Sequence, residues 1–348
     1  MLLPAVLLMC VCPVSGRDID EAEAAFERGR MMVRGKQFRK ASAVWDSIAR
    51  LNVTPDYKAK YLVYNGVLQR DSLRDTVRAL DYFRRAEACY PAIMQQKTDA
   101  IEIDIVHASR GLAEQAEAAR RFDVAVYHYD KIIALIDHMQ ANIHYASNMT
   151  YNDMTVTSVG FKLSKAADYA SMGRFDEAED VFENIEGSID FLKMSDDGEE
   201  VMQGWLLDCL SRMQRVNMYD KEMKDKAKAL DEAEQLYRRV QEGLLNENPA
   251  AAQGVQSQLS QCMVTVGEIF LANDRSEEVV DICRSTIGSL QSGDSVRPLM
   301  LDLMGRAYLA LGYETEARQC WRDVLAADYG FYEKPGHSQI LHIRWGKK

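Results

Sequence analysis

Small and aromatic residues return along this chain at spacings that suit pairs of packed α-helices. The clearest span holds Ala166, Tyr169, Gly173, Phe175, Ala178 and Phe182. Where two helices cross, small side chains let the backbones approach and aromatic side chains fill the space beside the crossing. A glycine between the two halves suits the turn that reverses the chain. The pattern therefore predicts antiparallel helix pairs, and the strict alternation typical of β-strands is scarce.

The same small position can be followed at seven places along the chain. It falls at Ala41, Ala79, Ala125, Ala178, Ala233, Val279 and Ala317, so the intervals are 38, 46, 53, 55, 46 and 38 residues. Helix pairs that stack in series, each touching only its neighbours, form a solenoid. We therefore expect an all-α solenoid of about seven helix pairs, with long central helices.

The longer central intervals place extra residues near 92–105, 140–158 and 193–218. The apolar spacing of Ile101, Ile103 and Ile105 indicates longer helices in the first of these regions. The polar stretch 148–153 predicts a loop instead. Further along, Asp196 is expected to cap a helix, with Glu199 three residues later in the manner of a capping box.

These positions resemble the tetratricopeptide repeat, a 34-residue helix–turn–helix unit with characteristic small and aromatic sites. The last copy matches well through Met304, Gly305, Tyr308, Gly312, Ala317 and Trp321. Because the central pairs are long, the chain is most similar to divergent arrays of exported bacterial proteins. The resemblance implies a right-handed α-solenoid over residues 17–328, with inner helices that line a concave groove.

The two ends of the chain differ from the repeats. Residues 1–16 hold no charge, and the apolar run 2–14 is too short to cross a bilayer but suits a signal peptide. We expect export to the periplasm or cell envelope of a Gram-negative bacterium. The run lacks a basic start, so a lipid anchor at Cys10 or Cys12 and a cytoplasmic protein stay open as alternatives.

The C-terminal tail, residues 329–348, is not a repeat. Gly330, Pro335 and Gly336 break any helix, so we expect the tail to fold back and cap the array. A disordered end that carries a partner-binding stub is the alternative.

Composition narrows the classes of function. The net charge of −11 argues against nucleic acid, whose phosphates favour clustered lysine and arginine. Without Cys10 and Cys12, five scattered cysteines remain, and they form neither a disulfide framework nor a zinc motif. Cys283 occupies a repeat position usually held by a large apolar residue, which predicts a place in the core.

No motif predicts catalysis or a cofactor. The segment 29–36 fails as a phosphate loop, because five residues separate its glycines and Gln37 follows the lysine. The six histidines form no metal motif, and the acidic residues 196–200 lack calcium-loop spacing. We expect no catalytic residue, no metal and no cofactor, although a hydrolase triad assembled in space stays open as a third hypothesis.

The resemblance places the expected groove on ten residues. They are Phe26, Arg30, Arg110, Glu114, Leu163, Ala167, Val264, Glu268, Asp302 and Arg306. In one subclass of tetratricopeptide arrays, basic residues at such positions hold a C-terminal carboxylate, and this chain lacks that clamp. We therefore expect the partner to be a helical or extended segment packed by side-chain contacts.

Two hypotheses follow for the function. The first is an exported scaffold without catalysis that binds a protein or peptide in the groove. The alternative is a sensor lipoprotein that binds a small molecule or carbohydrate on the same helical scaffold. A cleft with converging Trp, Tyr and carboxylates would favour the sensor, and a plain apolar groove would favour the scaffold.

Overall fold

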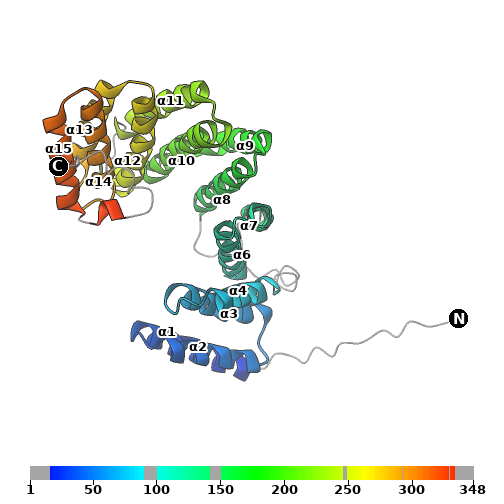
Figure 1. Ribbon diagram of the computed structural model, residues 1–348. Coiled ribbons are helices and arrows are strands. Elements are labelled where there is room, and N and C mark those ends of the chain that lie inside the picture. The colour runs from blue at the N-terminus through cyan, green and yellow to red at the C-terminus, as the bar shows by residue number, and fades with distance from the viewer. Residues whose placement is uncertain are drawn as a thin grey trace. The chain divides into compact units, whose positions relative to one another are not determined.

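The computed structural model describes residues 16–89, 100–141, 150–245, 249–291, 293–328 and 330–333. Within these ranges it contains helices and short helical turns and no β-strand, so the all-α prediction is confirmed (Figure 1). The chain divides into two compact units, residues 1–154 and 155–348. The expected signal peptide and most of the expected cap lie outside the described residues.

Unit 1 consists of helices that pack in adjacent pairs. They are α1 (Gly16–Arg34), α2 (Phe38–Ser47), α3 (Pro55–Asp71), α4 (Thr76–Glu87), α6 (Ala100–Ala118) and α7 (Phe122–Ala141), with a 3-10 turn η1 (Ile48–Arg50) after α2. We call the first helix of each pair the A helix and the second the B helix. The A helix α6 packs against both α3 and α4, so each pair contacts the next through its A helix.

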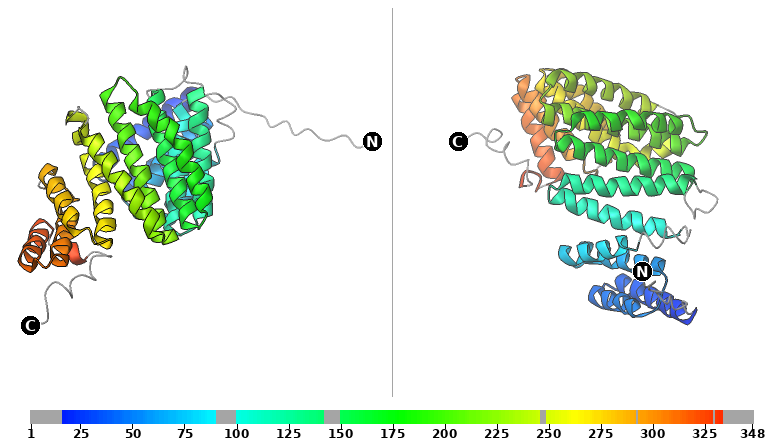
Figure 2. Two further views of the ribbon diagram at one scale, coloured as in Figure 1. Left: turned by 90° about the horizontal axis from the view of Figure 1, so that it is seen from above. Right: turned by 90° about the vertical axis from the view of Figure 1, so that its right-hand side faces the viewer.

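Unit 2 repeats this arrangement. It contains α8 (Tyr151–Ser171, which begins at the end of unit 1), α9 (Phe175–Lys193), α10 (Gly198–Asn217), α11 (Lys226–Leu245), α12 (Pro249–Ala272), α13 (Ser276–Ser289), α14 (Arg297–Ala310) and α15 (Glu314–Ala327). A π-helical turn η3 (Met218–Met223) follows α10. The A helices α10, α12 and α14 pack in sequence, and each also contacts the preceding B helix (Figure 2).

The small positions of the sequence pattern lie where helices cross. All seven, from Ala41 to Ala317, have fully buried side chains. In the first pair, a Cβ atom on Gly29 would lie 2.1 Å from Nε1 of Trp45, and in the last pair a Cβ on Gly305 would lie 2.5 Å from Nε1 of Trp321. The glycines are therefore needed for close approach of A and B helices, as the pattern predicts.

One aromatic ring joins two neighbouring helix pairs in unit 1. Phe83 of α4 is fully buried. A Cβ atom on Gly66 of α3 or on Gly111 of α6 would each lie 2.6 Å from this ring. The ring thus fills the space between two A helices, and both helices leave room for it by carrying glycine at the contact.

Every A–B turn in the described chain contains a residue in the left-handed conformation. These residues are Lys36, Arg74, Arg120, Gly173, Lys224, Asp274 and Gly312, with φ between 55° and 84°. In most of these turns the next amide donates to the carbonyl five residues back, as Arg174 N does to Tyr169 O at 2.9 Å. Only two of the seven are glycine, so a search for turn glycines finds Gly173 and Gly312 and misses the others.

Two local predictions were wrong. Residues 151–153 are helical, because Thr150 and Asp153 cap α8 reciprocally: Thr150 N donates to the Asp153 carboxylate at 2.8 Å, and Asp153 N donates to Thr150 Oγ1 at 3.0 Å. The cap of α10 is Asp197 rather than Asp196, since its carboxylate accepts a bond from Glu199 N at 2.8 Å.

The core prediction for cysteine is confirmed. Cys283 is fully buried in the core of unit 2, and Cys209 and Cys262 are buried with it. Burial raises the pKa of each of these thiols, to about 12 for Cys262. These cysteines therefore behave as small apolar residues of the core.

The start of the tail packs on the last helix pair. Phe331 and Tyr332, in the turn η4 (Phe331–Glu333), are buried against Leu301 of α14 and Val324 of α15. Residues 334–348 lie outside the described chain.

Candidate functional site

Phe26, a residue of the expected groove, forms part of an aromatic cluster in unit 1. Its ring stacks on Trp45 with centroids 5.8 Å apart and meets Tyr64 edge-on at 4.8 Å. Phe26 is buried, whereas Tyr64 of α3 is exposed over 40% of its surface. The three rings fix one another in place, and Tyr64 is the one among them that is exposed.

The charged residues of the expected groove in unit 1 are paired within the protein. Arg30 donates to Glu27 one turn earlier at 2.9 Å. Glu114 of α6 accepts from Arg110 on the same helix and from Arg70 of α3, both at 2.7 Å. The second of these pairs connects two neighbouring A helices.

In unit 2 the expected groove residues fall into two groups. Leu163 and Val264 are buried in the core, Leu163 with an exposed fraction of 4%, and Ala167 is half-buried. Leu163 therefore supports packing, and a charged substitution there would test stability and not binding.

The second group is polar and joins three elements. Arg306 of α14 forms a bidentate pair with Glu268 of α12, with one contact at 2.8 Å, and also pairs with Asp302 at 3.1 Å. The buried carboxylate of Asp302 in turn accepts a hydrogen bond from the Tyr332 hydroxyl at 3.1 Å. These residues connect α12, α14 and the start of the tail.

A pocket opens between the A helices α1 and α3 of unit 1. Its cavity measures about 260 Å³ and is lined by Glu23, Phe26, Glu27, Tyr57, Lys60 and Tyr61, with Ala22 and Ile48 beneath. Tyr57 donates its hydroxyl proton to Glu23 at 2.7 Å, and Nζ of Lys60 lies 4.6 Å from the centre of the Phe26 ring. Tyrosines and carboxylates thus converge here, and the lining is not plainly apolar.

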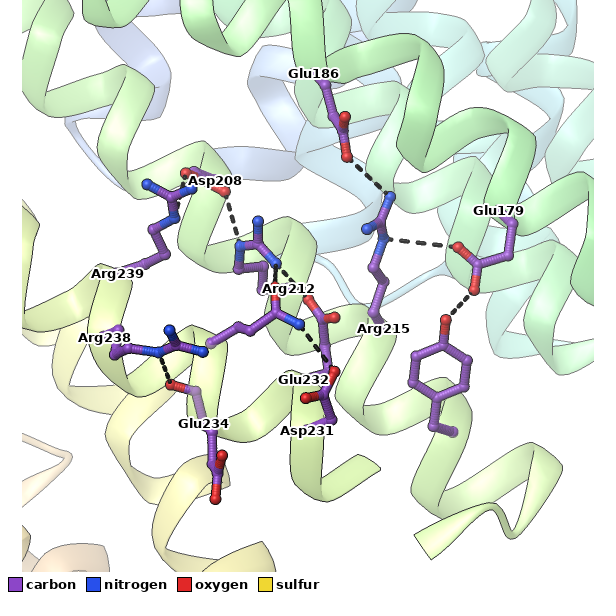
Figure 3. A network of polar contacts seen from close by, with 12 residues as sticks. Glu179, Glu186, Asp208, Arg212, Arg215, Asp231, Glu232, Glu234, Arg238 and Arg239 are labelled. Carbon is purple, nitrogen blue, oxygen red and sulfur yellow. Dashed lines mark hydrogen bonds and ion pairs between the residues drawn. The ribbon is translucent and has the colours of Figure 1, made fainter. Parts of the chain in front are cut away.

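A network of charged residues lies between α9, α10 and α11 of unit 2 (Figure 3). At its centre Asp208 of α10 pairs with Lys193 of α9, with Arg212 at 3.2 Å and with Arg239 of α11 at 3.7 Å. Arg212 also donates to Glu232 of α11 at 2.8 Å. One carboxylate therefore holds three cations from three helices.

Burial sets the electrostatics of this network. Burial raises the pKa of the Glu232 carboxyl, and Arg212 acts in the opposite direction through its charge and its hydrogen bond. Burial lowers the pKa of the Arg212 guanidinium, but the charges of Glu232 and Asp208 outweigh it and raise that pKa overall. The arginine keeps its charge at any physiological pH.

Arg215 extends the network toward the next turn of α10. Its guanidinium lies over the ring of Phe182, 5.2 Å from the ring centre, and donates to Glu186 of α9 at 3.2 Å. Glu179 lies 3.7 Å from its Nε and accepts the hydroxyl proton of Tyr219. The pKa of Tyr219 is raised, first by burial and then by this carboxylate.

No pattern in the sequence was interpreted as this network. Its central residues, Lys193, Asp208, Arg212 and Arg215, belong to the region 193–218, which exceeds the repeat length and was interpreted only as added helix or loop. A signal was present, since Asp208, Arg212 and Arg215 follow the spacing i, i+4, i+7 and so share one face of a helix.

Among the described residues, no three His, Cys, Asp or Glu side chains gather so as to hold a metal ion. No helix in the described ranges has both the length and the apolar composition to span a bilayer. Neither the models of known protein families nor the curated proteins with which the sequence was compared match it.

Proposed function

We propose that this protein is a tetratricopeptide-type scaffold, a right-handed solenoid of about seven helix pairs, that binds a segment of a partner protein on its A helices. The pocket between α1 and α3 carries the proposal. Recognition by helical arrays uses side chains that insert between neighbouring helices. Here an aromatic wall, Phe26 and Tyr57, lies beside a charged rim, Glu23 and Lys60. Buried aromatic side chains beside polar rims are typical of interface hot spots.

The size of the pocket favours a side chain of a partner over a free ligand. Its 260 Å³ lies below the range of about 300–1,000 Å³ common for small-molecule sites. The lining carries Glu23 and Glu27 against Lys60, a net charge of −1. A lysine or arginine of the partner suits this site, because its apolar stem would lie on the rings while its cation meets the carboxylates.

The second candidate is a small-molecule or carbohydrate sensor on the same scaffold. Tyr57, Tyr61 and two carboxylates converge in the pocket, and this is the arrangement expected of a sensor. We rank it second because of the small volume. Export to the cell envelope belongs to both candidates and rests on residues 1–16 alone, so N-terminal sequencing of the mature protein tests it: a product that begins at Met1 contradicts cleavage.

Photo-crosslinking distinguishes the two candidates. A photo-reactive phenylalanine analogue replaces Tyr64, next to the pocket, or Val77, an exposed residue of the B helix α4. We expect a protein crosslink from position 64 that position 77 does not give. Glu23→Lys should abolish it, because it replaces a carboxylate that meets the partner's cation by another cation. Glu21→Lys, the same change at an exposed site on α1, should not.

Two outcomes would contradict the proposal. One is an identical crosslinking pattern from positions 64 and 77. The other is a crosslink at position 64 that survives Glu23→Lys in a protein whose circular dichroism and melting temperature match the wild type. A thermal shift by dialysable cell extract, without any protein crosslink, would support the sensor instead.

A further inference from the structure

The charged network of unit 2 surrounds a cavity of its own. The cavity measures about 110 Å³, the space of roughly four water molecules. Four cations line it: Lys193, Arg212, Arg215 and Arg239. Three carboxylates line it as well, Asp208, Glu186 and Asp190, so the charges sum to +1. Outside this lining, Glu232 pairs with Arg212 and Glu179 pairs with Arg215, so the cations face the cavity while carboxylates behind them balance their charge.

Three of the four cations are much more buried than the two carboxylates at the rim. The side chains of Lys193 and Arg215 are 15% exposed and that of Arg212 is 16% exposed. Glu186 and Asp190, by contrast, are 59% and 71% exposed at the rim. Most of the free energy needed to remove the cations from water is therefore spent when the protein folds, and not when a ligand binds. The rim carboxylates can return to water at little cost in free energy.

Two of the arginines retain hydrogen-bonding capacity. Nε of Arg212 and Nε of Arg215 are buried and make no hydrogen bond within the described structure, although each lies near a carboxylate. The Phe182 ring holds the face of the Arg215 guanidinium and leaves its edge for acceptors. Once Glu186 leaves, the guanidinium edge of Arg215 suits an oxyanion that accepts parallel hydrogen bonds.

We propose that this cavity binds the dianion of a phosphate monoester or inorganic phosphate. The anion displaces Glu186 and Asp190 from Arg215 and Lys193 and takes their place. Four cations and Asp208 then leave a charge of +3, and a dianion restores the +1 of the empty cavity. A monoanionic carboxylate would bind less tightly than a dianion, because its charge would replace that of only one of the two rim carboxylates. Asp208 and Glu232 stay in place and hold Arg212.

Isothermal titration of the full-length protein tests the site with three probes: inorganic phosphate, phosphoserine and serine, at constant ionic strength. We expect both phosphates to bind and serine not to bind. Equal affinity for the two phosphates indicates the free ion as the natural source, and tighter binding of phosphoserine indicates a phosphorylated residue or metabolite. Phosphoserine should also bind more tightly at pH 7.5 than at pH 5, because its second pKa is near 6.

Variants that are expected to change the affinity in opposite directions make the test specific. Arg215→Gln should weaken phosphoserine binding at least about tenfold, since a hydrogen bond to a charged group contributes about that much or more. The double variant Glu186→Gln, Asp190→Asn should strengthen it about tenfold by removing the competing carboxylates. The controls Arg284→Gln and Asp281→Asn remove an exposed ion pair of α13 and should change nothing.

Three results would overturn the proposal. One is the absence of phosphate binding at millimolar concentrations, and another is equal loss in Arg215→Gln and Arg284→Gln. The third is unchanged or weaker binding in the double variant, which carries more positive charge and keeps every cation. Failure here leaves the pocket of unit 1 untouched, because the two sites share no residue.

Discussion

Replacing Gly305 by alanine tests whether glycine is required where an A helix crosses its B helix. Two effects oppose one another in this variant. Alanine in a helix interior gains about 0.8–1.0 kcal/mol over glycine. The added methyl group would lie 2.5 Å from Nε1 of Trp321, whose ring is buried. Overpacking of this kind costs about 1–3 kcal/mol, so we expect a net loss of up to about 2 kcal/mol.

Gly187→Ala is the matched control in the same unit. Gly187 lies in the middle of α9, and a Cβ atom there meets nothing within 4 Å. The same gain in helix propensity applies without the clash, so this variant should be more stable than the wild type by up to about 1 kcal/mol. The two variants should therefore differ by about 2 kcal/mol, which for a unit of this size is about 4–8 °C in melting temperature.

Differential scanning calorimetry provides the measurement, because it separates transitions if the two units melt independently. A Gly305→Ala protein as stable as Gly187→Ala would refute the reasoning. A further variant tests whether Gly305→Ala destabilises α14 through its contact with Trp321 or for some other reason. Trp321→Phe shortens the ring at the contact, so in that background Gly305→Ala should lose less stability than it does in the wild type.

Two further predictions concern the turns and one buried carboxylate. Lys224→Gly should stabilise unit 2 by about 0.5–1 kcal/mol, because Lys224 has a φ of 59°, which glycine adopts more easily. Gly173→Ala should destabilise unit 2 for the same reason. Equal effects of the two variants on the melting temperature would contradict this prediction. Burial raises the pKa of Glu87, but hydrogen bonds from His128 and Lys131 outweigh it and lower the pKa below 4.5. The carboxylate therefore stabilises the fold above that pH, and Glu87→Gln should cost about 1 kcal/mol at pH 7. The loss should become smaller as the pH of the melts falls below 4.5, and a difference that stays constant with pH would oppose this assignment.

The sequence predicted helix pairs because packing at their crossings constrains residue size strongly. At Gly305 one added methyl group would clash with Trp321, and Ala178 is fully buried at its crossing, so the size pattern can be recognised in a single sequence. The left-handed residues of the turns could be predicted only in part. Lys36 and Arg74 have a positive φ, and neither lysine nor arginine is a residue type that favours this conformation. Exposed turns tolerate such strain at a cost of about 1 kcal/mol.

The candidate sites were harder to predict than the fold. Phe26 was placed on the expected groove, and it does line the pocket of unit 1. Leu163 was assigned to the same groove by its position in the repeat, but a shift of one residue, about 100° around the helix axis, decides between core and surface. The charged network depends on Lys193 and Arg239 from two other helices, and residue spacing within α10 carries no information about them.

The ring of Phe83 has a consequence for how this sequence can change over evolutionary time. The two glycines that face it, Gly66 and Gly111, belong to different helix pairs, yet neither can grow while the phenylalanine remains. A smaller residue at position 83 would have to precede or accompany any enlargement at 66 or 111. In an alignment of close relatives, these three positions should therefore covary as one group, although 45 residues separate the first from the last.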